Sequence, residues 1–369
     1  MRRHVVLISP PWYPVPPVGY GGIELVVGLL SRELRARGHA VTLIAAEGTV
    51  EPATVLAPAE WSADLGGSAE PLRRATYAAR LLEPLRAVRD PDVVHDHCGL
   101  SALVAAAALD IAPVVHTVHG PLTEPDATLL GSFPTTVGLV AISSAQRRSA
   151  PQLPWLGTIH NAVDSSALSI ARSEEKEAYL LCLARICREK GQHLAIEVAR
   201  RTGMRLVLAG KVEQTPASRA YFEELVAPHI DGVRIVHTHN VAGVEKARLL
   251  AHALALLAPL QWDEPFGLAL AEAMASGTPV VALARGAAPE LIVSGVTGFV
   301  AEDLDGLVYG VRIARQIDPA RCAADARARF SPGAMTDAYL AAYDRAGTPA
   351  AQPQSPGSSE ERLKTYAVV

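Results

Sequence analysis

The chain has 369 residues, of which 49% are hydrophobic and 20% charged, and its formal net charge is −4. At about 150 residues per domain, this length predicts two domains, and the mild acidity excludes the basic face that a nucleic-acid partner requires. No apolar run reaches the ~18 residues of a membrane span, so we expect a cytoplasmic protein without a transmembrane segment.

Continuous apolar runs in the first half of the chain predict β-strands, and longer helical patterns lie between them. The expected strands cover residues 4–9, 40–46, 92–97, 113–119 and 137–143, and the expected helices cover 23–37 and 72–88. The strand runs are apolar throughout instead of alternating with polar residues. This pattern is typical of parallel strands that helices cover on both faces.

The same alternation returns in the second half of the chain. The expected strands there cover residues 179–184, 205–210, 233–238, 253–259 and 279–283, and the expected helices cover 193–201 and 268–276. We therefore predict an α/β protein of two doubly wound, Rossmann-like domains. Ligands of such sheets bind beyond the carboxyl ends of the strands, so we expect a cleft between the domains.

A polar segment near residues 170–176 sets the predicted domain boundary, which gives domains over 1–170 and 171–332. A further helix is expected over 333–347, with the N-terminal domain as a candidate surface for it to pack back on. Residues 348–369, rich in Pro, Gln and Ser, predict a disordered tail. The cysteines lack the spacing of zinc ligands and are expected to be reduced thiols; they are Cys98, Cys182, Cys187 and Cys322.

Polar and glycine residues in the first half lie where predicted strands end or a helix begins. Gly21 and Gly22 close a long Pro-rich loop at a helix start, and such a glycine pair favours an anion or a sugar ring. His119 is last on its strand, so we expect its side chain to point into the cleft. Further polar side chains in comparable positions are Glu24, His95 and His97.

A loop and helix in the second half predict a site for phosphate and sugar groups. The amides of Phe266, Gly267 and Leu268 lack helical partners at the expected helix start and suit phosphate or sugar oxygens. Carboxylates accept hydrogen bonds from vicinal hydroxyls, so Glu264 and Glu272 are candidate sugar contacts. The rest of the helix is apolar, and we therefore expect Glu272 to be buried and to need a partner.

Two cations follow the first predicted strand of the second half. Arg185 and Lys190, beside a glycine, suit a diphosphate, because a guanidinium can fork two oxygens and a lysine supplies a point charge. By themselves, two such residues in a loop are more often solvated surface cations than a binding site.

Taken together, these segments resemble the retaining glycosyltransferase family 4, which has the GT-B fold. The resemblance rests on the Arg-x4-Lys-Gly segment at 185–191 and on Glu-x7-Glu at 264–272, and it covers residues 3–347. One departure is Ala184, where the family usually has glycine. Tyr-Gly-Gly-Ile-Glu at 20–24 resembles a subgroup found in polysaccharide and natural-product glycosylation.

The resemblance implies a hexosyltransferase that moves a sugar from a nucleotide-sugar donor to an acceptor hydroxyl with retention of configuration. The second domain would bind the donor, and the first would face the acceptor. The implied donor-binding residues are Gly21, Gly22, Arg185, Lys190, Glu264, Phe266, Gly267, Leu268 and Glu272. The implied catalytic residues are His119, Glu264, Arg185 and Lys190, and the candidate acceptor-side residues are Glu24, His95 and His97.

Among these implied roles, Arg185 and Lys190 hold the diphosphate, Glu272 the ribose and Glu264 the transferred sugar. We expect neither a metal nor a cofactor, because the donor is itself a substrate. The acceptor is left open among a saccharide, a natural product and a lipid-linked molecule. Two alternatives are a GT-B nucleotide-sugar epimerase and a sugar-nucleotide-binding protein without turnover. The missing G-x-G-x-x-G segment disfavours a dinucleotide-dependent oxidoreductase.

Overall fold

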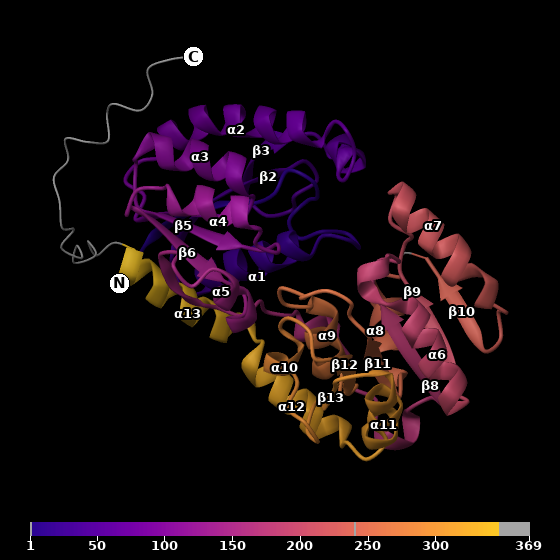
Figure 1. The fold of residues 1–369 in the computed structure, drawn as a ribbon. Coiled ribbons are helices and arrows are strands. Elements are labelled where there is room, and N and C mark those ends of the chain that lie inside the picture. The colour runs from indigo at the N-terminus through magenta and orange to yellow at the C-terminus, as the bar shows by residue number, and fades with distance from the viewer. Residues whose placement is uncertain (1, 240, 347–369) are drawn as a thin grey trace.

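The computed structural model describes residues 2–239 and 241–346. They form two α/β lobes, each built on a twisted parallel sheet (Figure 1). The predicted fold class is therefore confirmed. The predicted tail over 348–369 lies outside the described residues. Within the described ranges, no helix combines the length and the apolar character of a membrane span.

The first lobe contains a seven-stranded sheet in the order β3-β2-β1-β4-β5-β6-β7. Every recorded strand pair in it is parallel. Sequence patterns missed both edge strands, β3 and β7, because their side chains are half-exposed and form no continuous apolar run. The strands are β1 (His4–Ile8), β2 (Ala40–Ala46), β3 (Ala53–Ala57), β4 (Val93–Asp96), β5 (Val114–Val118), β6 (Val137–Ala141) and β7 (Trp155–Thr158).

Helices cover both faces of the first sheet. One apolar cluster joins the sheet to α2, α3 and α4, and another joins it to α1 and to the C-terminal helix. Of the helices within this lobe, α1 and α2 were predicted and the shorter ones were not. The helices are α1 (Gly22–Ala36), α2 (Glu70–Ala87), α3 (Leu100–Leu109), α4 (Glu124–Gly131) and α5 (Ser144–Ser149).

The second lobe contains a six-stranded sheet in the order β10-β9-β8-β11-β12-β13, again with parallel pairs. Its strands are β8 (Tyr179–Leu183), β9 (Arg205–Ala209), β10 (Ile235–Thr238), β11 (Ala255–Ala258), β12 (Val280–Leu283) and β13 (Gly298–Ala301). Its helices are α6 (Gln192–Thr202), α7 (Pro216–Leu225), α8 (Gly243–His252), α9 (Leu268–Ala275), α10 (Ala288–Leu291), α11 (Leu304–Ala314) and α12 (Pro319–Arg329).

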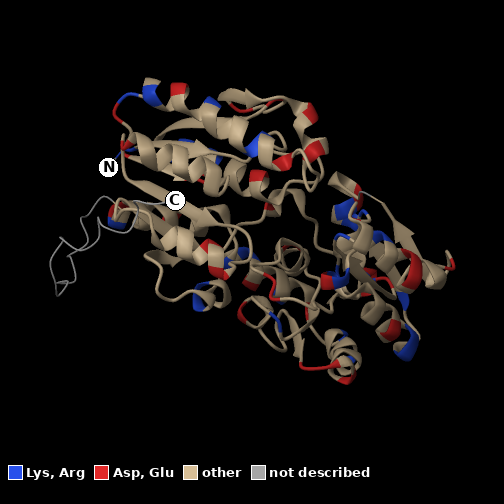
Figure 2. Cartoon of the chain, turned by 45° about the horizontal axis from the view of Figure 1, so that its top comes forward, with Lys and Arg blue, Asp and Glu red and all other residues tan. Residues whose placement is uncertain are grey.

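The last described helix, α13 (Pro332–Ala346), follows the second lobe in the chain but packs on the first (Figure 1). Its Tyr339 and Tyr343 are fully buried in the cluster that contains α1. The chain therefore crosses between the lobes twice, and α13 ties the end of the second lobe to the first sheet. Charged residues of both signs are mixed over both lobes in Figure 2.

Candidate active site

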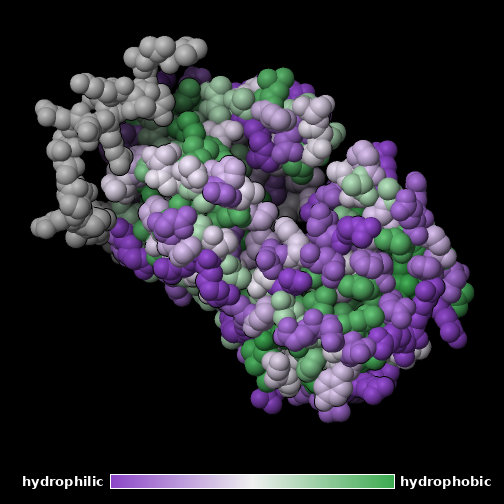
Figure 3. Space-filling view, viewed as in Figure 1, coloured by the Kyte–Doolittle hydropathy of each residue, from purple (hydrophilic) through white to green (hydrophobic). Residues whose placement is uncertain are grey.

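A cleft of about 730 Å³ lies between the two lobes, where the carboxyl ends of both sheets face each other. Figure 3 shows the hollow between the lobes from outside. The cleft wall combines loops that follow β1 and β5 in the first lobe with loops that follow β8 and β11 in the second. Most residues singled out in the sequence line it, namely Gly21, Gly22, Glu24, His119, Arg185, Lys190, Glu264, Phe266, Gly267, Leu268 and Glu272.

The start of α9 forms one side of this cleft. Gly267 precedes the helix with a φ of 91°, a left-handed conformation that favours glycine. The first amides of a helix have no partner inside it and carry part of the helix dipole. Gly22 lies directly opposite, since a Cβ added to it would come 2.7 Å from Leu268 Cδ1. The glycine pair of the first lobe and the α9 N-terminus therefore meet across the cleft.

Glu272 lies one turn inside α9 and is 7% exposed. Lys246 Nζ on α8 donates a 2.6 Å hydrogen bond to its Oε1 and thereby forms an ion pair. The partner that the sequence required for Glu272 is therefore Lys246, which itself lines the cleft. Sequence analysis missed Lys246, because one lysine in an ordinary amphipathic helix carries no signal of its own.

The two predicted phosphate-binding cations also have acidic partners. Lys190 forms an ion pair with Glu264, whose Oε2 also accepts a 3.0 Å hydrogen bond from Trp262 Nε1. Arg185 forms an ion pair with Glu213, whose other oxygen accepts a 3.0 Å bond from Ser218. Arg185, Lys190 and Lys246 thus bring three positive charges to the cleft. Each forms an ion pair with one carboxylate, from Glu213, Glu264 and Glu272 respectively.

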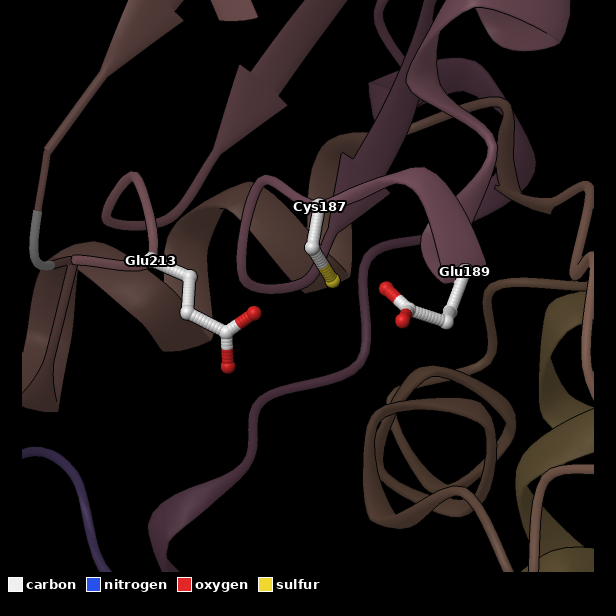
Figure 4. A group of neighbouring side chains, drawn as sticks. All are labelled: Cys187, Glu189 and Glu213. Atoms are coloured by element: carbon white, nitrogen blue, oxygen red, sulfur yellow. The ribbon is translucent and has the colours of Figure 1, made fainter. Parts of the chain in front are cut away.

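Glu213 also belongs to a small cluster with Cys187 and Glu189, shown in Figure 4. Their potential metal-ligand atoms lie within 4.8 Å of one another. Burial raises the pKa of the Cys187 thiol to about 11, and the thiol, unlike the thiolate, is a poor ligand. Because Arg185 and Ser218 occupy the Glu213 carboxylate, hydrogen bonds and an ion pair account for this cluster as it stands.

Glu24 is a buried acid in the first-lobe wall of the cleft, with only 3% of its surface exposed. Among the described residues it forms no ion pair. Burial raises its pKa to about 8, although the backbone amides of Glu24 and Tyr13 donate hydrogen bonds that oppose this shift. The carboxyl lies beside the glycine pair, because a Cβ on Gly21 would come 3.2 Å from Glu24 Oε2.

Of the three histidines singled out in the sequence, only one lines the cleft. His119 lines the cleft as predicted. His95 is fully buried, and its two ring nitrogens lie 2.7 Å from Tyr343 Oη and 2.8 Å from Thr117 Oγ1. The structure therefore does not bring His95 to the cleft, because α13, far away in sequence, covers it. His97 is also buried. It does not line the cleft, but it contacts His119 and lines a smaller pocket of about 280 Å³ that shares His119 with the cleft.

Glu290 links the two lobes. From α10 it accepts hydrogen bonds from the amide and hydroxyl of Ser144 at the start of α5, at 2.7 and 3.0 Å. His160 Nε2 lies 2.7 Å from the same carboxylate. Burial alone would raise the pKa of Glu290, but the bonds from His160 and Ser144 outweigh it and lower the pKa.

Comparisons with known proteins agree with this geometry. Residues 20–167 match the model of Glycosyltransferase Family 4, and residues 167–311 match the model of Glycosyl transferases group 1. The chain is therefore a glycosyltransferase. Glycogen synthase of Mycobacterium tuberculosis (strain CDC 1551 / Oshkosh) is 29% identical to this glycosyltransferase over 388 residues, which cover 88% of this chain and 89% of that protein.

A D-inositol 3-phosphate glycosyltransferase of Mycobacterium marinum is 29% identical over 324 residues, covering 75% of this glycosyltransferase and 68% of that one. Among solved structures, AviGT4, a glycosyltransferase involved in avilamycin A biosynthesis, matches with a TM-score of 0.69 and 26% identity, covering 93% and 97% of the two chains. Anabaena HepE in complex with UDP and glucose matches with a TM-score of 0.70 at 19% identity, covering 92% and 98%. These neighbours confirm the GT-B fold.

Proposed function

We propose that this glycosyltransferase moves a sugar from a nucleotide-diphosphate sugar to an acceptor hydroxyl and retains the anomeric configuration. The observation that carries the proposal is the convergence of Arg185, Lys190 and Lys246 with the α9 N-terminus in one cleft between the lobes. Three cations and a helix N-terminus suit a ligand with two linked phosphates. The HepE neighbour, which is solved with UDP and glucose, supports this class of donor.

In the proposed complex, the donor diphosphate replaces acidic partners of the cleft cations. Arg185 leaves Glu213, Lys190 leaves Glu264, and both bind phosphate oxygens. Glu264 is then free to accept hydrogen bonds from hydroxyls of the transferred sugar. Glu272 keeps Lys246 at Oε1 and offers its other oxygen to the ribose. The amides of residues 266–268 lie beside the phosphate and the sugar.

Catalysis in this proposal is mainly electrostatic. As the bond from the anomeric carbon to the phosphate oxygen breaks, its electron pair stays on the nucleoside diphosphate. In the complex, the cations and the α9 amides face that developing charge, so they stabilise the transition state more than the ground state. The acceptor hydroxyl attacks the same face of the sugar, and its proton passes to the departing phosphate oxygen. No protein nucleophile is needed in this route.

A panel of donors tests the proposal first. Thermal unfolding is measured with UDP-, GDP-, ADP- and dTDP-glucose, each at several concentrations. A ligand that binds only the folded state stabilises it by RT ln(1 + L/Kd) at free ligand concentration L, so the midpoint keeps rising with ligand concentration and rises more for a tighter ligand. We expect one base to stabilise the protein clearly more than the others. Equal, negligible shifts with all four sugars and with all four free nucleoside diphosphates would count against a nucleotide-sugar site.

A further inference from the structure

Two histidines at the ends of neighbouring strands share a hydrogen bond behind the cleft wall. His97 follows β4 and His119 follows β5. Nδ1 of His97 lies 2.9 Å from Nε2 of His119, and the rings are stacked with an interplanar angle of 28°. His119 lines the cleft, whereas His97 is 2% exposed and does not reach it. The second nitrogen of His97, Nε2, is buried and has no hydrogen-bond partner among the described residues.

Both rings are neutral under ordinary conditions. Burial lowers the pKa of His97 well below its usual value, and burial also lowers that of His119, to about 3. A neutral imidazole carries one N–H and one bare nitrogen. A hydrogen bond between two neutral rings therefore holds a single proton. Either His97 donates it to His119, or His119 donates it to His97.

The two arrangements differ at the outer nitrogens. If His119 donates, His97 must carry its own proton on Nε2, which leaves a buried N–H without an acceptor. If His97 donates, its Nε2 is a bare acceptor, and His119 carries its proton on Nδ1. An orphaned N–H in a protein interior is rarer than an acceptor that lacks a donor, and this difference favours donation by His97.

We propose that His97 is a positioning residue that holds His119 in the tautomer with its proton on Nδ1. His119 thereby presents an N–H donor to the cleft. Such a donor suits an oxygen of the bound sugar or phosphate, and this part of the inference rests on the proposed function. The hydrogen bond on one ring nitrogen sets the protonation of the other, which is how a buried neighbour controls a histidine in contact with ligand.

Other polar groups near His97 and His119 have hydrogen-bond partners of their own. His95 has fixed partners on both ring nitrogens. Asp96 Oδ2 lies 2.7 Å from Nδ1 of His116 and is therefore engaged on the adjacent strand. Neither ring shares a recorded hydrogen bond with His119. The tautomer of His119 therefore depends on His97.

Nuclear magnetic resonance of the full chain with ¹⁵N-labelled histidine tests the tautomer directly. The resonances of His119 are assigned by their loss in His119→Asn. We expect Nδ1 protonated and Nε2 bare in the wild-type protein. His97→Asn, whose amide N–H can replace Nδ1–H, should keep this pattern. His97→Asp, which can only accept, should move the proton of His119 to Nε2. A wild-type spectrum with the proton on Nε2 overturns the proposal, even if His97→Asp fails to fold.

Binding supplies a second readout. Affinities of UDP and UDP-glucose are compared by calorimetry, or those of another nucleotide pair if the donor screen selects it. We expect His97→Asp to weaken binding of the nucleotide sugar about tenfold relative to the free nucleotide, and His97→Asn to restore the wild-type ratio. If neither variant changes the ratio, His97 does not act through His119. If the wild-type protein binds no nucleotide, the proposed function fails while the tautomer result stands.

Discussion

Lys246 on α8 donates a 2.6 Å hydrogen bond to Glu272 on α9, and this ion pair joins two helices at the edge of the cleft. Glu272 is buried, so an unpaired charge there would be costly. The pair holds one carboxylate oxygen in place. The other oxygen is then oriented for a ligand instead of turning inside an apolar helix. Lys246 is thus a part of the proposed ribose site that acts through Glu272.

Variants at Lys246 and Glu272 should therefore separate the effect of the ion pair on stability from its effect on nucleotide binding. Lys246→Met leaves Glu272 without its partner, and we expect a loss of about 1–3 kcal/mol in the free energy of unfolding and about tenfold weaker nucleotide binding. Adding Glu272→Gln removes the buried charge and should recover most of the stability but none of the affinity. Urea unfolding and calorimetry on both single variants and the double variant measure this coupling. Additive stability changes would show that the two residues do not interact.

The raised pKa of Glu24 predicts that the stability of the fold depends on pH. Its folded pKa of about 8 lies above the ordinary value of 4.5, so the folded state binds the proton more tightly than the unfolded state. The stability from the neutral carboxyl is full below about pH 4.5 and is lost as the pH rises through about 8. The loss is on the order of 5 kcal/mol, at ~1.4 kcal/mol per pKa unit.

Glu24→Gln is the matched variant for this test, because its side chain stays neutral at every pH. Urea unfolding is compared between wild type and variant at pH 5, 7 and 9. We expect the free energy of unfolding of the variant to rise relative to that of the wild type as the pH rises. The contributions of other titrating groups cancel in this difference. A difference that is constant over this range would mean that Glu24 is already ionised at low pH.

Gly286 should be essential for the shape of the Glu264 loop. It has a φ of 54°, and an added Cβ would lie 2.3 Å from the backbone N and O of Glu264. We expect Gly286→Ala to destabilise the fold by several kcal/mol, roughly the range of strain and overpacking combined, and to weaken donor binding. Gly295→Ala is the control, since Gly295 has a φ of 75° but no atom within 4 Å of an added Cβ. Equal effects of the two variants on nucleotide affinity would argue against this role.

Glu290 should hold the lobes in their present arrangement. Glu290→Ala removes acceptors for Ser144 and His160 on the other side of the lobe interface. We expect about 1–3 kcal/mol lower stability and a larger radius of gyration in small-angle X-ray scattering. The exposed Glu302 offers a control, as Glu302→Ala should change neither quantity. An unchanged radius of gyration in Glu290→Ala would mean that this carboxylate only caps the start of α5 and does not hold the lobes together.

The sequence predicted the parts of the fold that have a strong periodic signal. Ten apolar runs became parallel strands, and the half-exposed strands β3, β7 and β13 were missed. The defining residues of the Arg-x4-Lys and Glu-x7-Glu segments line one cleft, namely Arg185, Lys190, Glu264 and Glu272. Their adjacency follows from parallel topology, since the loops after β8 and β11 leave neighbouring strands at the same edge.

The rest of the site depends on packing between distant segments. His95 lies on β4 and His97 directly after it. Nothing local shows that Tyr343 of α13, 248 residues further along the chain, covers His95. The roles of Lys246 and Glu213 follow from which helix or loop lies beside α9 and Arg185 in the fold. A pattern read along the chain contains neither relationship.

In the proposed function, Arg185 and Lys190 bind the diphosphate of a nucleotide donor. The decisive measurement of this role is calorimetric titration of UDP, GDP, ADP and dTDP into the wild type and into Arg185→Ala and Lys190→Ala. Arg201→Ala is the control, because Arg201 lies on α6 and pairs with Asp305 outside the cleft. We expect about tenfold to hundredfold weaker binding of the preferred nucleotide in each cleft variant and wild-type affinity in the control. Wild-type affinity in both cleft variants would contradict this role.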